Sequence, residues 1–178
     1  MAKKQGTFSS RTKARKRAAD VIFEAQQKGL DRDGEQLLDL LAQRQLVSAA
    51  QTPLPAYSRQ IVRGVAQFRS EIDGQIQKHS KIKALDRLPG VDLAILRVAV
   101  WEMIGNRDDV DPIVAIDEAV AIAKSISTDR SPAFVNAVLD AIRRDLLAQG
   151  EVPAVPAEVV PAGEATTDEL WDELLDEY

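Results

Sequence analysis

Apolar residues recur along this chain at the three- and four-residue spacings typical of helices that bury one face. The clearest stripe consists of Ile61, Val65, Phe68, Ile72 and Ile76. Its successive members are four, three, four and four residues apart. We expect this helix or helix pair to begin near Pro53 and Pro55 and to run to about His79. The pattern is compatible with a break near Ser70. No segment alternates apolar and polar residues long enough to predict a strand.

Two helices are expected before that stripe. Ser9 or Ser10 is a suitable N-cap for the first, which Gly29 ends. A second helix follows the segment from Asp31 to Gly34, and its apolar side consists of Leu37, Leu38, Leu40 and Leu41.

Three more helices are expected after the stripe. The first begins at Pro89 and Gly90 and ends at Gly105. Asp111 and Ser131 each precede a proline, which places an N-cap side chain directly before a residue whose fixed φ suits the first helical position. The predicted class is all-α, with five to seven helices and short loops that favour antiparallel neighbours.

Composition narrows the class of protein. The 178 residues suit one domain of ordinary size, and a hydrophobic content of 45% is enough to fill its core. The chain has no cysteine, no apolar signal segment and no run approaching the length of a membrane span. We therefore expect a soluble, cytoplasmic protein.

The net charge of −5 conceals a strong segregation of charge. Nine acidic residues and no Lys or Arg follow Gly150, which leaves 19 acidic against 23 basic residues in positions 1–150. We expect a disordered basic arm over residues 1–10, an all-α domain over 11–150 and an acidic, mostly disordered tail over 151–178. The tail either solubilises the chain or competes with an anionic partner for the basic arm.

Seven cations occur in the first seventeen residues, before any acidic residue: Lys3, Lys4, Arg11, Lys13, Arg15, Lys16 and Arg17. Cations at a helix N-terminus oppose the macrodipole, so local stability does not favour this placement. The phosphates of RNA or DNA are the favoured explanation, and a solvated arm is the alternative.

Candidate catalytic groups are scarce. The chain has no Gly-rich phosphate loop, no paired Cys or His ligands and no nucleophile elbow. Asp117 and Glu118 fall on the polar side of their helix, and His79, the only histidine, is expected to be exposed. The neighbouring Lys78, Lys81 and Lys83 form either a phosphate-binding surface or a solvated face. We predict a non-enzymatic protein with no cofactor and no metal site.

Three segments, taken in order, carry a family resemblance: LPGVDLAILRVAVWEM, VDPIVAIDEAVAIAKS and SPAFVNAVLDAI. Together with RKRAADVIFEA and IVRGVAQFRSEID they resemble the bacterial transcription antitermination factors of the NusB family, over about residues 10 to 146. The resemblance implies a compact fold of two three-helix subdomains. It also implies binding to boxA RNA in nascent ribosomal transcripts together with NusE, the ribosomal protein S ten, in an antitermination complex with RNA polymerase.

The resemblance also implies particular residues. Its RNA contacts map onto Arg11, Lys13, Arg15, Lys16, Ser131 and Phe134, and its protein-partner face maps onto Phe23 and Asp92. An aromatic ring such as Phe134 can stack on an unpaired base. Helical periodicity places Phe134 equally well in the core, and Phe23 has the same ambiguity.

Two other classes remain open. The same fold occurs as the RNA-binding accessory domain of ribosomal RNA methyltransferases, but this chain shows no cofactor-binding motif. The other alternative is a helical protein-interaction module, or a homodimer that masks the RNA surface.

Overall fold

The structure is a computed structural model, and it describes residues 8–46 and 52–150. Over these residues it has seven α-helices, one short 3-10 turn and no strand, so the all-α prediction is confirmed. The elements are α1 Ser10–Lys28, α2 Gly34–Leu46, α3 Ala56–Gln67, α4 Arg69–Ser80, η1 Leu85–Arg87, α5 Gly90–Gly105, α6 Pro112–Ile126 and α7 Ser131–Ala148.

Several helix ends follow from local side-chain chemistry. The Ser9 hydroxyl accepts the backbone N–H of Thr12 at the start of α1, and Gly29 ends the helix with a φ of 68° that favours glycine. The Asp111 carboxylate caps α6 in the same way. These caps were predicted from the sequence.

One boundary lies close to the sequence-based prediction and one differs from it. The long stripe breaks at Phe68, between α3 and α4, two residues before Ser70, the position near which the sequence allowed a break. Ser131 is the first residue of α7 and not its N-cap, because its hydroxyl binds a neighbouring carboxylate instead of the helix backbone.

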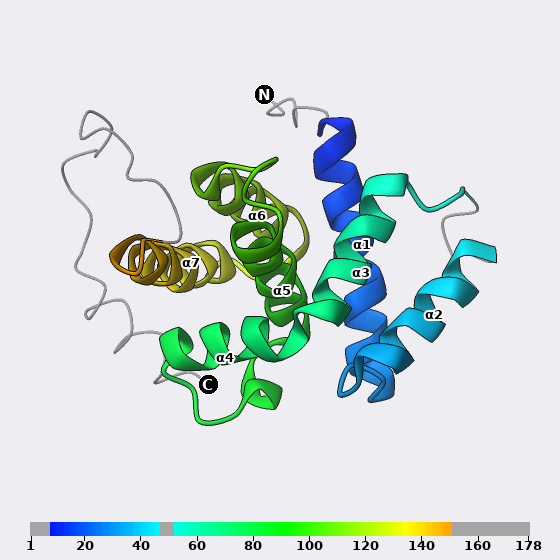
Figure 1. Ribbon diagram of the computed structural model, residues 1–178, viewed down its shortest axis with the longest axis horizontal. Coiled ribbons are helices and arrows are strands. Elements are labelled where there is room, and N and C mark those ends of the chain that lie inside the picture. Colours follow the sequence, from blue (N-terminus) through cyan, green and yellow to red (C-terminus); the bar gives the residue numbers. More distant parts are fainter. Residues whose placement is uncertain (1–7, 47–51, 151–178) are drawn as a thin grey trace.

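The helices form two groups around α5, as Figure 1 shows. Helices α1, α2 and α3 pack against one another on one side of α5, while α6 and α7 pack on its other side. Helix α4 contacts α5 and α7 and follows directly from α3. The predicted two three-helix groups are therefore present, and one continuous apolar core joins them.

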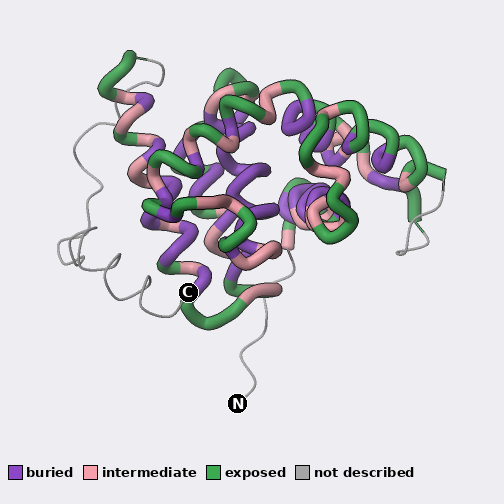
Figure 2. Tube along the Cα trace, turned by 90° about the horizontal axis from the view of Figure 1, so that it is seen from below, coloured by how far each residue is buried: buried purple, intermediate pink, exposed green. Residues whose placement is uncertain are grey.

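Helix α5 is buried on all sides, including its charged residues. Every residue from Asp92 to Met103 is buried, whereas the apolar spacing along the chain is typical of helices that bury one face. Figure 2 shows the same distribution, with buried segments inside and exposed segments at the periphery. None of the described helices is long and apolar enough to cross a membrane.

Candidate nucleic-acid interface

The first half of α1 is fixed to three other helices by a buried ion-pair network. The Arg15 guanidinium, on a side chain only 4% exposed, donates two hydrogen bonds to the Glu102 carboxylate of α5, at 2.8 and 2.9 Å. The Tyr57 hydroxyl of α3 donates to the same carboxylate at 2.8 Å. Glu118 of α6 lies 3.3 Å from Arg15 and accepts the Thr12 hydroxyl at 2.6 Å. The burial of Arg15 leaves its guanidinium no surface for a phosphate in this conformation.

Arg11, one helical turn earlier, has an exposed ion pair. Its Nη2 atom lies 2.7 Å from Oδ2 of Asp109, and the two side chains are 44% and 54% exposed. The guanidinium carbon also lies 4.1 Å from the centre of the Tyr57 ring, which is within cation–π distance. The hydrogen bond from Arg11 lowers the pKa of Asp109 below its ordinary value. Burial and the neighbouring Glu102 carboxylate raise the pKa of Tyr57 to about 12.

The remaining cations of α1 differ in their roles. Lys13 is exposed and Lys16 is half-buried. Arg17 donates hydrogen bonds to the Pro53 carbonyl at 2.8 Å and to the Thr52 hydroxyl at 3.1 Å, so it holds the segment before α3. The predicted cations Lys3 and Lys4 and most of the basic arm lie outside the described residues.

Asp92 and Ser131, assigned by resemblance to different interfaces, bind each other. The Ser131 hydroxyl donates to one Asp92 carboxylate oxygen at 2.9 Å, and the Ser127 hydroxyl donates to the other at 2.6 Å. Ser131 also shares a hydrogen bond with the Thr128 hydroxyl at 2.8 Å. Asp92 and Ser131 are fully buried, and burial raises the pKa of Asp92. The cluster ties the first turn of α5 to the loop between α6 and α7.

Phe134 lies in the core. Its side chain is only 1% exposed and belongs to the same apolar cluster as Val135 and Val138. Of the two interpretations that the sequence left open, this position supports the core residue and leaves no ring face for a base in this conformation.

Phe23 lies half-buried on α1, close to the start of α5. A Cβ atom added to Gly90 would lie 2.9 Å from Cε2 of Phe23, so a larger residue at this position would have to displace the Phe23 ring. The two residues predicted for partner binding therefore differ in access: the Phe23 ring reaches the surface in part, whereas Asp92 does not.

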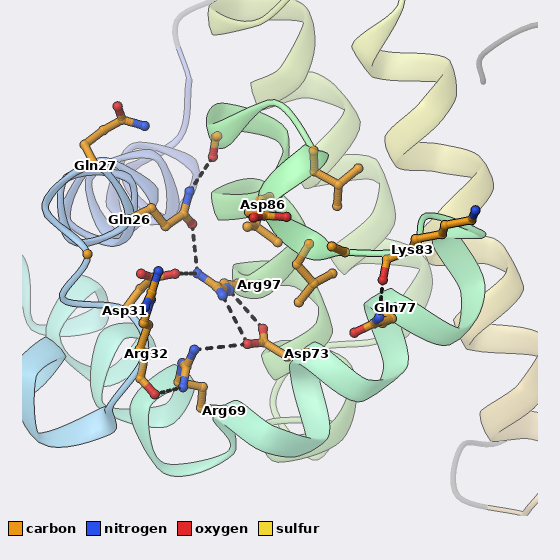
Figure 3. A pocket seen from close by; sticks show the side chains of 16 residues that line it. Gln26, Gln27, Asp31, Arg32, Arg69, Asp73, Gln77, Lys83, Asp86 and Arg97 are labelled. Carbon is orange, nitrogen blue, oxygen red and sulfur yellow. Dashed lines mark hydrogen bonds and ion pairs between the residues drawn. The ribbon is translucent and has the colours of Figure 1, made fainter. Parts of the chain in front are cut away.

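A polar cavity of about 530 Å³ opens beside Gly90, between the end of α1, α4, η1 and α5 (Figure 3). Arg97 crosses its floor, donating to Asp73 at 2.9 and 3.1 Å and to Asp31 at 2.9 Å. Gln26 accepts from the same guanidinium at 3.1 Å and donates to the Gly90 carbonyl at 2.7 Å. Arg97 is 3% exposed, and its charge is already paired with two carboxylates. It therefore holds α1, α4 and the residues after α1 together and is not an open anion site.

His79 is not exposed, contrary to the sequence-based prediction. Its side chain is only 15% exposed, and its Nε2 atom lies 3.1 Å from Oδ2 of Asp145 on α7. Lys78 donates to the same carboxylate at 2.7 Å. The hydrogen bond from Lys78, followed by the smaller effect of His79, lowers the pKa of Asp145 to about 2. Both side chains tie α4 to α7.

No pattern in the sequence indicated Tyr57 and Asp109, although both contact the basic first turns of α1. Tyr57 follows a proline-rich connector and resembles any apolar residue at a helix start. Asp109 lies 98 positions away from its partner Arg11, so no local pattern relates the two.

The structure therefore defines a compact, all-helical protein with the exposed cations Arg11 and Lys13 at the start of its first helix. The chain belongs to the NusB family, whose family model matches residues 12–144. It is 44% identical to the transcription antitermination protein NusB of Beutenbergia cavernae, over 77% of this chain and 91% of that protein. It is 42% identical to the protein of the same name from Corynebacterium jeikeium, over 94% of this chain and 85% of that protein.

Solved structures show the same fold. T. maritima NusB matches with a TM-score of 0.60 and 28% identity, covering 78% of this chain and 94% of that one. A chain from a structure described as the crystal structure of a plectonemic RNA supercoil matches with a TM-score of 0.61 and 26% identity, over 79% and 98% of the two chains. The family assignment from the sequence is thus confirmed.

Proposed function

We propose that this chain binds boxA RNA in nascent ribosomal transcripts together with NusE, the ribosomal protein S ten. The pair would help RNA polymerase read through terminators, in the cytoplasm. Membership of the transcription antitermination family NusB is the observation that carries this proposal. Arg11, Lys13 and Lys16 support it, because their side chains keep exposed surface that a polyanion can reach.

The proposed RNA contacts divide into two groups by their burial. Arg11, Lys13 and Lys16 retain exposed surface and would meet phosphates directly. Arg15 and Ser131 are buried, so they would act by holding the start of α1 and the α6–α7 loop in position. We assign Phe134 the same supporting role beneath that loop.

The proposed partner surface includes Phe23 and the rim of the polar cavity beside Gly90. Asp92 would contribute indirectly, because its carboxylate lies beneath this surface and binds the α6–α7 loop. A partner that displaced the first turn of α5 would therefore also move the loop.

A binding titration with boxA RNA, with NusE and with both together tests the proposal. We expect the protein to bind each ligand and to bind RNA more tightly when NusE is present. Light scattering on the same samples reports whether the protein is a homodimer. A protein that binds neither ligand, or a stable dimer that RNA leaves intact, would contradict the proposal.

A further inference from the structure

We propose that Asp109 occupies the Arg11 guanidinium in the free protein and competes for it with an RNA phosphate, and that Tyr57 holds the guanidinium in place during the exchange. This inference rests on the proposed RNA binding. It adds an internal competitor and a positioning residue that the sequence did not indicate.

The Arg11–Asp109 pair has the properties of an exchangeable contact. Both side chains are about half exposed, and a single 2.7 Å contact joins them. Exposed ion pairs of this kind contribute little to stability, so an incoming anion can replace the carboxylate at small cost. The Arg15–Glu102 pair on the same helix is the opposite case, because it is buried and has two hydrogen bonds.

Tyr57 limits where the Arg11 guanidinium can go. The Arg11 guanidinium carbon lies 4.1 Å from the centre of the ring, and that of Arg15 lies 5.5 Å from the same centre. The ring is itself fixed, because its hydroxyl donates to the buried Glu102 carboxylate at 2.8 Å. When Asp109 leaves, Arg11 therefore remains on the ring with its outer N–H groups available. Guanidinium groups bind phosphate through such paired donors.

The charges around this position favour an RNA phosphate as the replacing anion. Lys13 is exposed two residues further on, and the basic arm precedes Arg11 in the chain. Cations in the first turn of α1 oppose the helix dipole, and Asp109 offsets part of that charge in the free protein. A polyanion can offset all of it and gains counterion release when it binds.

Asp109→Asn tests the competitor, and Asp108→Asn is its matched control. Asp108 is exposed in the same loop, and over the described residues its carboxylate has no hydrogen bond or ion pair. Both substitutions remove one negative charge from this loop, but only the first removes the carboxylate that pairs with Arg11. With the full chain and a boxA RNA oligonucleotide at low salt, we expect Asp109→Asn to tighten binding about two- to five-fold relative to Asp108→Asn. Equal affinities for the two variants would overturn the proposal.

The double variant Arg11→Gln, Asp109→Asn separates competition from general electrostatics. If Asp109 acts only through Arg11, Arg11→Gln alone weakens binding and the gain from Asp109→Asn disappears in its presence. A gain that persists without Arg11 contradicts the proposal. If the wild-type chain binds no RNA, the proposed function fails instead, so the two failures are distinguishable.

Tyr57→Phe and Tyr57→Leu test the positioning role. Both lose the hydroxyl that donates to Glu102, so their thermal unfolding midpoints report the cost of that hydrogen bond. Only Tyr57→Leu also loses the aromatic face under Arg11. We expect Tyr57→Leu to bind RNA more weakly than Tyr57→Phe at a temperature at which both are folded, and to show a smaller salt dependence. Equal RNA affinity and equal salt dependence would exclude Tyr57 as a positioning residue.

Discussion

Arg15 and Arg11 show how two arginines one helical turn apart acquire different roles. Arg15 is 4% exposed and completes a buried network with Glu102, whereas Arg11 is 44% exposed and pairs at the surface. Removing one partner of a buried pair leaves an uncompensated charge in the interior, which costs far more than losing a surface pair. Within the described part of the basic cluster, Arg15 and Arg17 are therefore structural cations, whereas Arg11 and Lys13 are exposed.

Arg15→Ala should mainly destabilise the fold, and Lys16→Ala should mainly weaken RNA binding. Loss of Arg15 leaves Glu102 buried without a cation, and we expect the free energy of unfolding to fall by about 3–5 kcal/mol. Lys16→Ala should leave that free energy almost unchanged and reduce the salt slope of RNA binding by about 0.7 per lost phosphate contact. Urea denaturation and salt titrations measure the two effects. A stable Arg15→Ala variant with a reduced salt slope would show instead that Arg15 contacts RNA directly.

Asp92 should make stability depend on pH. Burial raises its pKa, so the folded state holds this proton more tightly than the unfolded chain does. The contribution of this group to the free energy of unfolding is thus largest below the ordinary pKa of about 3.9 and is lost as pH rises through the raised value.

Asp92→Asn has no carboxyl to ionise, so its stability relative to the wild type should rise between about pH 4 and pH 7. Urea denaturation of both proteins across this range measures the difference. Ser131→Ala serves as a control, because it removes a donor to Asp92 but keeps the carboxyl. A difference that does not change with pH would mean that Asp92 titrates alike in the folded and unfolded states.

At the scale of single elements, helix ends were predictable and buried charges were not. The caps at Ser9 and Asp111 depend on side chains within three residues of the helix start, so the sequence indicated them. The three charged residues inside α5 are Asp92, Arg97 and Glu102. Each is buried because a partner distant in the chain satisfies it, and periodicity contains no information about such partners.

Phe134→Ala in α7 should behave as a core truncation. The ring is 1% exposed, and its removal leaves a cavity beside Val138, so we expect a loss of about 3–5 kcal/mol in the free energy of unfolding. Phe134→Leu should lose less and stay folded. Its affinity ratio between boxA RNA and a scrambled RNA of equal length should match that of the wild type. A lower ratio in this folded variant would show that the ring contacts a base after all.

At the scale of the whole molecule, α5 connects the two proposed binding surfaces. Through Glu102 it holds the start of α1, through Arg97 it holds the floor of the cavity, and through Asp92 it holds the α6–α7 loop. Each connection is a buried contact of a charged residue, so a shift of α5 would displace the start of α1, the cavity floor and the α6–α7 loop together. The sequence predicted these surfaces as separate motifs, and the tertiary contacts show that the residues proposed for both are held by one helix.

The acidic tail, residues 151–178, lies outside the described residues. The sequence predicts that it either solubilises the chain or competes with an anionic partner for the basic arm. Its nine acidic residues oppose a body that carries a net +4. If they compete with RNA for the basic arm, ending the chain at Gly150 should tighten boxA RNA binding at low salt. The gain should fade at high salt, because the Debye length shrinks from about 10 Å at 0.1 M to about 3 Å at 1 M.

Replacing the nine tail carboxylates with amides keeps the length of the tail and removes its charge, so it is the matched control for the truncation. Competition by charge predicts that both variants bind RNA equally well and more tightly than the wild type. A gain from the truncation alone would indicate that the bulk of the tail obstructs RNA. No gain from either variant would leave the tail a solubilising segment and Asp109 the principal acidic competitor for Arg11.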